Sequence, residues 1–358
     1  MEVRKIDHLE FYVGNAADAA SYLCTAYGFR IHGQGGPETG LPGCRSLLLR
    51  QQGISLLLTS ALDEGHPAAD YVRRHGDGVA VIALEVGDTH AAFAEAVERG
   101  SAPVAPPADL EKDGTRVTFA SVSGFGDVAH RFVTRDAADG LFAPGVIEQA
   151  VPAPDLDGRL LTVDHIAVCL PAGELTETVR RYQEVLGFAQ TFEERIVVGS
   201  QAMDSKVVQS PSGEVTLTLI EPDTTRNPGQ IDEFVRAHDG GGVQHVAFLS
   251  NDIAAAVRAI SGHGVRFLST PASYYDALPD RLGPVGAQLE TLRELSILAD
   301  RDNWGVMFQI FAESVHARRT FFYEVIERRG ALTFGSRNIQ ALYEAVERQR
   351  AADQALRT

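Results

Sequence analysis

The sequence predicts an α+β protein of four βαβββ-type modules, paired into two domains that are each a curled mixed sheet around a cavity, plus a C-terminal helix. Three observations predict this fold class: the chain repeats itself, each repeat opens with a strand pattern followed by a helix pattern, and β-rich runs separate the helices. The chain has 358 residues, 44% of them hydrophobic, which suffices for about two domains that each bury a core.

The first pair of repeats opens the two halves of the chain. Residues 6–29 read IDHLEFYVGNAADAASYLCTAYGF, and residues 163–188 read VDHIAVCLPAGELTETVRRYQEVLGF. Each segment is a short β-type run, a polar turn and an amphipathic helix that ends in Gly-Phe. The two segments therefore predict equivalent first modules in each half.

A second pair of repeats follows the first. Residues 77–100 and 241–264 each read as a strand, an Ala-rich helix and a terminal glycine. Asp88 and Asp252 are the expected N-caps, because an Asp side chain accepts hydrogen bonds from the first free amides of a helix. These segments predict the second module of each half.

The boundary between the halves is expected within residues 143–159, which are rich in Pro, Gly and Asp and have no sustained period. We therefore expect one domain at residues 1–150 and a second at residues 151–358, which ends in a helix expected from about Ser336. The first domain is expected to be structural or an oligomer interface.

Composition narrows the classes of partner. The net charge is −16, which argues against nucleic acid and membrane surfaces as partners, because both select for basic patches. The sequence shows no secretory signal and no apolar run long enough for a membrane span. The three cysteines are far apart and form no CxxC pair. We expect a cytoplasmic protein that acts on a small molecule and forms a homo-oligomer.

Equivalent positions in the two halves differ in their capacity to bind a metal. The second half carries two imidazoles and one carboxylate, about one module apart, at His165, His245 and Glu324. The first half carries His8, Val81 and Arg131 at the corresponding positions. Valine cannot bind a metal, and arginine would repel one. Two histidines and one carboxylate form the facial triad that suits non-haem Fe(II) and O2.

The residues alone leave a second interpretation open. A strand histidine is more often a satisfied core or surface residue than a metal ligand. Against that, Glu324 lies inside the apolar run FFYEVI, where a carboxylate is costly to bury without a partner. We expect His238, His263 and His316, which lie in polar segments, to be solvated.

Long ordered segments of the chain resemble the 4-hydroxyphenylpyruvate dioxygenase family of the vicinal oxygen chelate superfamily. They include VDHIAVCL, GVQHVAF, FFYEVIERRG and TFGSRNIQALYEAVE. The resemblance implies Fe(II) as the cofactor, bound by His165, His245 and Glu324. Residues 151–358 are therefore the expected catalytic Fe(II) domain, with the C-terminal helix covering the site, and residues 1–150 the expected domain without metal. It also implies 4-hydroxyphenylpyruvate and O2 as substrates, with the α-keto acid of the substrate acting as the reductant. No catalytic residue beyond the metal ligands is implied.

Four residues depart from the pattern of the dioxygenase that forms homogentisate. That enzyme has Pro and Asn in a P-x-N-E-P stretch and phenylalanines in G-F-G-x-x-N-F-K-A-L-F. This chain has Thr218, Ile220, Ile339 and Tyr343 at those positions. All four resemble the branch of the family that hydroxylates the benzylic carbon and yields 4-hydroxymandelate and CO2.

The resemblance also implies a pocket for the substrate. Its expected lining is Ser205, Val207, Thr218, Ile220, Gln309, Phe334, Ile339 and Tyr343, with Ser205, Thr218 and Gln309 as the polar contacts. Two alternatives remain: formation of homogentisate at the same iron site, and a metal-free small-molecule binding protein of the same fold.

Overall fold

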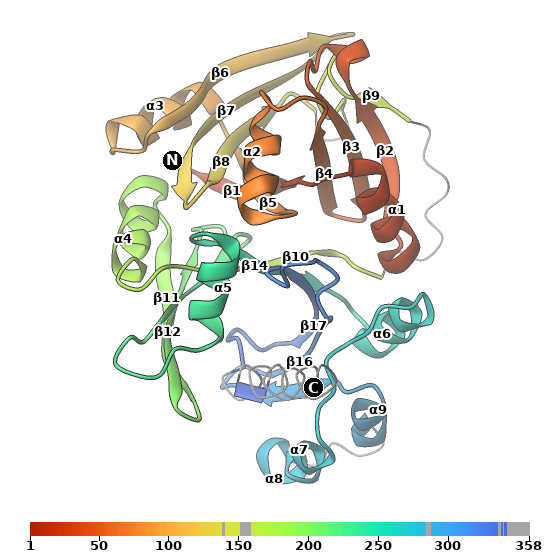
Figure 1. Cartoon of the computed structure of the whole chain (residues 1–358), viewed down its shortest axis with the longest axis vertical. Coiled ribbons are helices and arrows are strands. Elements are labelled where there is room, and N and C mark those ends of the chain that lie inside the picture. The colour runs from red at the N-terminus through yellow and green to blue at the C-terminus, as the bar shows by residue number, and fades with distance from the viewer. Residues whose placement is uncertain (138–139, 151–158, 284–287, 336–337, 339, 342–358) are drawn as a thin grey trace.

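The computed structural model describes the whole chain except residues 138–139, 151–158, 284–287, 336–337, 339 and 342–358. It consists of two curled mixed sheets, one from each half of the chain, which lie one above the other in Figure 1. Helices cover the sheets from outside. This arrangement confirms the predicted α+β class.

The first sheet has the strand order β6-β7-β8-β5-β1-β4-β3-β2-β9. Its strands are β1 (Val3–Tyr12), β2 (Arg30–Gly35), β3 (Cys44–Gln51), β4 (Ile54–Ala61), β5 (Gly78–Val86), β6 (Pro103–Lys112), β7 (Thr115–Phe125), β8 (Val128–Arg135) and β9 (Glu148–Gln149). Its helices are α1 (Ala16–Tyr27), α2 (Pro67–His75) and α3 (Thr89–Glu98), with a 3-10 turn η1 (Pro37–Thr39).

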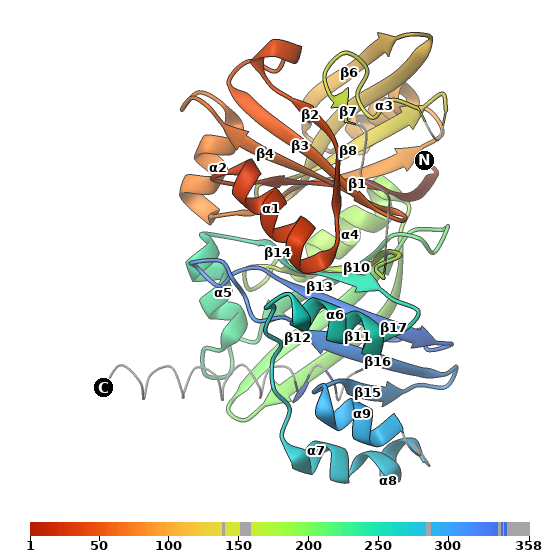
Figure 2. The same cartoon turned by 90° about the vertical axis from the view of Figure 1, so that its right-hand side faces the viewer.

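The second sheet has the strand order β11-β12-β13-β10-β14-β17-β16-β15. Its strands are β10 (Thr162–Cys169), β11 (Ala189–Val198), β12 (Gln201–Gln209), β13 (Thr216–Pro222), β14 (Gly242–Leu249), β15 (Leu298–Arg301), β16 (Val306–Phe311) and β17 (Phe322–Arg329). Its helices are α4 (Leu175–Leu186), α5 (Gln230–His238), α6 (Ile253–Gly262), α7 (Ala272–Asp276), α8 (Leu278–Leu282) and α9 (Gln288–Glu294). The last three lie beyond β15, at the end away from the first half (Figure 2).

Strand pairing shows the internal repeat directly. β1 pairs parallel with β4 and antiparallel with β5, and β10 pairs in the same two ways with β13 and β14. Asp88 and Asp252 cap α3 and α6 by accepting from Ala91 N and Ala255 N, as predicted. Sequence analysis did not predict α2, α5 and α7 to α9, because these helices are short and lie outside the repeated segments.

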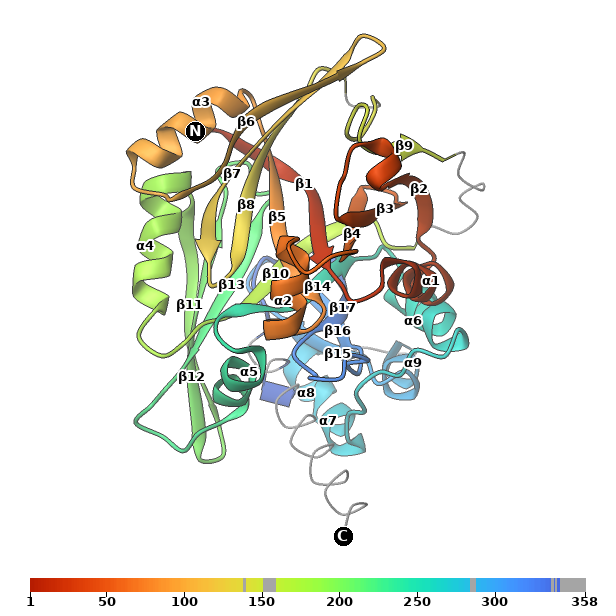
Figure 3. The same cartoon turned by 45° about the horizontal axis from the view of Figure 1, so that its top comes forward.

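Helices pair across the boundary between the halves. Contacts join α1 to α6, α2 to α5 and α3 to α4, and Figures 1 and 3 show α3 beside α4 on one flank and α1 beside α6 on the other. These contacts hold the two sheets together around a common core. Within the described residues, no helix is long and apolar enough to cross a membrane.

A layer of aromatic side chains lies between the two sheets. Phe11 contacts Phe321 with ring centroids 5.4 Å apart, and Tyr27 and Phe248 contact Tyr323 at 5.1 and 5.4 Å. We call these five residues the aromatic layer. Because successive side chains of a strand point to opposite faces, Tyr323 of β17 packs into this layer while Glu324 points to the other side of the sheet.

Candidate metal centre and its pocket

Three neighbouring strands, β10, β14 and β17, bring the predicted metal ligands together. The register aligns His165 of β10 with Ala247 of β14, and Ala247 with Glu324 of β17. His245 lies two residues before Ala247, so all three side chains emerge on one face. One ligand atom from each of His165, His245 and Glu324 lies within 4.8 Å of the others, and all three residues are buried.

The ring nitrogens of the two histidines have separate partners. His165 Nε2 and His245 Nε2 lie 3.4 and 3.3 Å from the same Oε2 of Glu324. The Nδ1 atoms face Asp164 Oδ1 at 2.8 Å and Gln244 Oε1 at 3.2 Å. When Nε2 carries no proton, an acceptor at Nδ1 holds the remaining proton there and directs the Nε2 lone pair to a metal, which is how proteins orient imidazole ligands. The donor set therefore fits a divalent transition metal.

Electrostatics around the three residues favours a positive charge. Burial alone would lower the pKa of His165, but the carboxylates of Glu324 and Asp164 outweigh it and raise the pKa to about 9. Burial lowers the pKa of His245. Burial would raise the pKa of Glu324, yet the charge of His165 and hydrogen bonds from both imidazoles lower it to about 2. A divalent cation would satisfy the same ionised carboxylate.

An outer group of residues fixes the orientation of His165. Arg328 donates two hydrogen bonds to Asp164, at 2.7 and 2.8 Å, and further bonds to the carbonyls of Ala331 and Thr333. Burial would raise the pKa of Asp164, but the bonds from His165 and Arg328 hold it well below its usual value. Through these hydrogen bonds the segment after β17 is connected to His165, a candidate metal ligand.

A second chain of hydrogen bonds begins at the other oxygen of Glu324. Gln309 Nε2 donates to Glu324 Oε1 at 2.9 Å, Asn338 Nδ2 donates to Gln309 Oε1 at 2.9 Å, and Tyr274 OH donates to Asn338 Oδ1 at 2.8 Å. The ionised carboxylate can only accept, so it sets the direction of every amide in the chain. Gln309 therefore holds Glu324, with one remaining N–H on its amide nitrogen.

The metal centre opens into a pocket of about 500 Å³. Beside the three ligand candidates, six of the predicted pocket residues line it: Ser205, Val207, Thr218, Ile220, Gln309 and Phe334. The Phe334 ring meets the His165 ring edge-on at 5.0 Å. Ile339 and Tyr343 lie outside the described residues, as does most of the predicted C-terminal helix, of which Asn338, Gln340 and Ala341 are described.

Sequence analysis missed three residues that line this pocket: Phe192, Glu194 and Phe311. Phe311 stands opposite Glu324 in the β16–β17 ladder, so the strand register could have found it. Phe192 and Glu194 lie on the edge strand β11, in the polar run TFEERI. From Phe192 onward β11 pairs regularly with β12, so Phe192 and Glu194 point to the same face as the buried Ile196.

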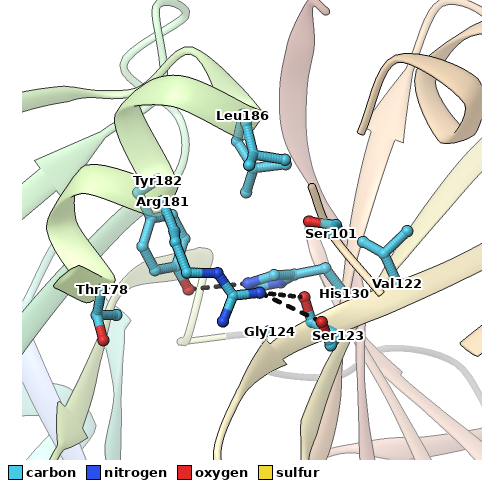
Figure 4. Close-up of a pocket in the computed structure, with 10 residues that line it drawn as sticks. Ser101, Val122, Ser123, Gly124, His130, Thr178, Arg181, Tyr182 and Leu186 are labelled. Atoms are coloured by element: carbon cyan, nitrogen blue, oxygen red, sulfur yellow. Dashed lines mark hydrogen bonds between the residues drawn. The ribbon is translucent and has the colours of Figure 1, made fainter. Parts of the chain in front are cut away.

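A smaller cavity of about 310 Å³ lies between α4 of the second half and β7 and β8 of the first (Figure 4). His130 Nε2 and the Tyr182 hydroxyl lie 2.9 Å apart across it, and Arg181 donates to the Ser123 hydroxyl at 3.2 Å. Burial lowers the pKa of His130 to about 4. This cavity marks a polar joint between the halves, away from the metal centre.

The expectation that His238 is solvated is wrong. His238 is 4% exposed, and its ring stacks between Phe234 and His75, a residue of the first half. The polar sequence DGGG after it suggests exposure, and the contact could not be foreseen because the partner His75 is 163 positions away. Burial, followed by the nearby His75, lowers the pKa of His238 to about 4.

Comparison with known proteins agrees with this architecture. Two models described as "Glyoxalase/Bleomycin resistance protein/Dioxygenase superfamily" match residues 5–129 and 164–278, one in each half. Curated relatives are the 4-hydroxyphenylpyruvate dioxygenases of Yarrowia lipolytica, 32% identical over 97% of this chain and 92% of that protein, and of Danio rerio, 34% identical over 96% and 90%. The chain belongs to the 4-hydroxyphenylpyruvate dioxygenase family.

A solved structure of the same family is closely similar. It is a mutant of 4-hydroxymandelate synthase from Streptomyces coelicolor, 42% identical, with a TM-score of 0.90 over 98% of this chain and 100% of that one. A fusion protein of a xylose isomerase-like TIM barrel and 4-hydroxyphenylpyruvate dioxygenase shares the fold at 24% identity and a TM-score of 0.76, over 96% of this chain and 52% of that one. As a 4-hydroxyphenylpyruvate dioxygenase family member, the chain is a dioxygenase.

Proposed function

We propose that the protein binds Fe(II) through His165, His245 and Glu324 and converts 4-hydroxyphenylpyruvate and O2 into 4-hydroxymandelate and CO2. The observation that carries the proposal is the combination of this ligand set with the Thr218 and Ile220 side chains in the pocket above it. The higher identity to the mandelate synthase structure, 42%, than to the curated dioxygenases above, 32% and 34%, supports the same branch.

Bound Fe(II) would supply the activation of O2 and the electron transfer for decarboxylation and hydroxylation. The chain itself supplies position and exclusion of water. Asp164 and Gln244 keep the proton on Nδ1 of each histidine, so that Nε2 is available as a ligand. Gln309 holds one oxygen of Glu324 and leaves the other to the metal.

The pocket decides which carbon of the substrate is hydroxylated. Ile220 presents an aliphatic side chain where the homogentisate-forming pattern has an asparagine, so it cannot orient a polar group of the substrate by hydrogen bonding. Displacements near 1 Å change reaction rates by about a hundredfold, so a small tilt of the ring suffices to bring the benzylic carbon rather than the ring carbon to the reactive position.

Product identification tests the proposal. Purified protein would be incubated with Fe(II), ascorbate, O2 and 4-hydroxyphenylpyruvate, and the products separated by chromatography with mass detection. The two candidate products are isomers, so both standards must be resolved. 4-Hydroxymandelate is the expected product, and homogentisate would assign the chain to the second candidate function.

Two further measurements sharpen the result. The Ile220→Asn variant should produce a larger fraction of homogentisate than the wild type, because it restores the polar side chain of that pattern. Protein that binds no iron under these conditions would contradict the proposal and favour a metal-free binding protein of the same fold.

A further inference from the structure

One carboxylate oxygen in the pocket wall lacks a hydrogen-bond partner among the described residues. Glu194 of β11 lines the pocket, and its Oε2 is buried without a hydrogen-bond partner among the described residues. Its neighbour Glu193 points to the opposite face, where it is 67% exposed and lies near Lys206 and Gln190. Burying an unpartnered carboxylate oxygen is costly, so the position of Glu194 suits a ligand that donates a hydrogen bond.

The strand register places Glu194 at the end of the pocket away from the metal ligands. Glu194 stands opposite Ser205, and Ser205 stands opposite Ile220. In the neighbouring row, Thr218 stands opposite Ala167, and Ala167 stands opposite His245. The row of Glu194 and Ser205 lies two residues farther along the strands. Two residues advance a strand by about 6.6 Å. Glu194 and Ser205 thus flank the part of the pocket that an elongated ligand reaches with its far end.

The chemistry of the two side chains is complementary to a hydroxyl group. A carboxylate accepts a hydrogen bond, and the Ser205 hydroxyl can donate one. A phenol does both at a single oxygen. A keto acid held at the metal centre by its carboxylate and keto oxygens would bring a ring hydroxyl to Glu194 and Ser205 if its ring extended from the row of His245 toward this row.

We propose that Glu194, assisted by Ser205, recognises the ring hydroxyl of a 4-hydroxyphenyl α-keto acid and so selects it over the unsubstituted phenyl compound. The inference rests on the proposed function, because it takes the substrate to be such an acid. A site built to pair with a hydroxyl rejects the analogue that lacks it, because its own polar group is then left buried and unpaired.

The experiment compares two ligands and four proteins. The ligands are 4-hydroxyphenylpyruvate and phenylpyruvate, and the proteins are wild type, Glu194→Gln, Glu194→Ala and Glu193→Ala. Dissociation constants would be measured without oxygen on the iron-loaded proteins, and kcat/KM with oxygen for both compounds. Glu193→Ala is the matched control, since it removes the same group from the outer face of the same strand. Circular dichroism would verify the fold of each variant.

We expect the wild type to prefer the hydroxylated compound. Glu194→Ala should reduce this preference by about 10- to 100-fold, as loss of a hydrogen bond to a charged group does. The variant should lose affinity for 4-hydroxyphenylpyruvate, while its affinity for phenylpyruvate is unchanged or improved. Glu194→Gln, which keeps an acceptor without the charge, should lie between, and Glu193→Ala should match the wild type.

Other results separate the two claims. A preference that survives Glu194→Ala, or equal losses for both ligands, would overturn the role of Glu194 and leave the proposed function intact. Selective binding of 4-hydroxyphenylpyruvate that depends on Glu194, but without turnover to 4-hydroxymandelate, would overturn the proposed function and support the recognition. Binding of neither keto acid to the wild type would overturn both.

Discussion

The second half of the chain brings together three candidate metal ligands where the first half brings together an ion pair. Both halves align three strands in the same register, through the rows His165–Ala247–Glu324 and His8–Ala83–Arg131. In the first half, Arg131 pairs with Glu10 at 2.8 Å and contacts His8 Nε2 at 3.3 Å. The guanidinium therefore supplies internally the positive charge that the second half would obtain from a cation.

The outer groups of the two halves are the same. Arg135 donates two hydrogen bonds to Asp7, as Arg328 does to Asp164, and each arginine packs over a phenylalanine ring, Phe142 or Phe334. The framework around the site is thus independent of a metal. The difference teaches that the ligand positions, and not the residues that support them, distinguish the two sites.

The ligand position itself gives the largest expected difference between the halves. His165→Ala removes one of three ligand candidates, so iron should be lost and product formation should fall by at least about 10³-fold. His8→Ala removes the equivalent residue of the first half and should leave iron content unchanged. Iron per chain after gel filtration, together with the rate of product formation, checks both. If the His165→Ala variant retained its iron, His165 would not be a ligand, and the two halves would not differ at this position in the way described.

The joint between the halves should respond to acid. Burial lowers the pKa of His130 to about 4, below the usual 6.5, so the unfolded chain binds a proton that the folded chain rejects. The stabilisation is complete above pH 6.5 and is lost as the pH falls toward 4, by about 3 kcal/mol in the free energy of unfolding. Urea unfolding at pH 7 and 4 measures it. The free energy of unfolding of His130→Gln should decrease less between pH 7 and 4 than that of the wild type. Equal decreases in both proteins would contradict this assignment.

The equivalent aspartates allow a sharper comparison. Asp164→Asn should weaken iron binding by about 10- to 100-fold, because the partner that orients His165 loses its charge. Asp7→Asn breaks the same kind of ion pair in the first half and should lower stability without changing iron affinity. Iron titration and thermal unfolding of both variants provide the readouts. If both variants lose iron to the same extent, the two halves are coupled more tightly than their separate clusters indicate.

The smallest expected effect comes from a contact that the first half lacks. Phe119 stands opposite Val133 as Gln309 stands opposite Ile326, and its ring packs on Arg131 instead of donating a hydrogen bond. Tyr274→Phe should weaken iron binding by about 2- to 10-fold, because it removes the hydroxyl that donates to Asn338, whose hydrogen bonds lead through Gln309 to Glu324.

The control for this last variant is next to it in the sequence. Tyr275→Phe removes a hydroxyl that takes no part in the chain from Tyr274 to Glu324, and its iron affinity should equal that of the wild type. Competition with a metal chelator would rank the two variants. Equal iron affinities of the two variants would show that the hydrogen bonds from Tyr274 to Glu324 do not position this carboxylate.

Strand repetition is what made the site predictable. His165, His245 and Glu324 recur one module apart, and the strands align them because the modules pair in register. The direction of Glu194 follows from strand alternation with Phe192 and Ile196, but nothing in the polar run TFEERI indicates that this face lines a pocket. The partners of Gln309 could not be foreseen either, since Asn338 is 29 positions away and no sequence pattern links them.

Through the aromatic layer, a residue of the first half packs behind the strand that carries Glu324. Phe11 reaches across to Phe321, which lies just before β17, and to Tyr323, which directly precedes Glu324 on that strand. Replacing a large core aromatic costs about 3 to 5 kcal/mol, and the void would open directly behind the strand that carries this carboxylate. Tolerance to substitution along β1 should therefore alternate: Glu10 could change together with Arg131, whereas Phe11 could not change freely. One face of β1 thus carries the ion pair of the first half, and the other packs behind the strand that carries Glu324.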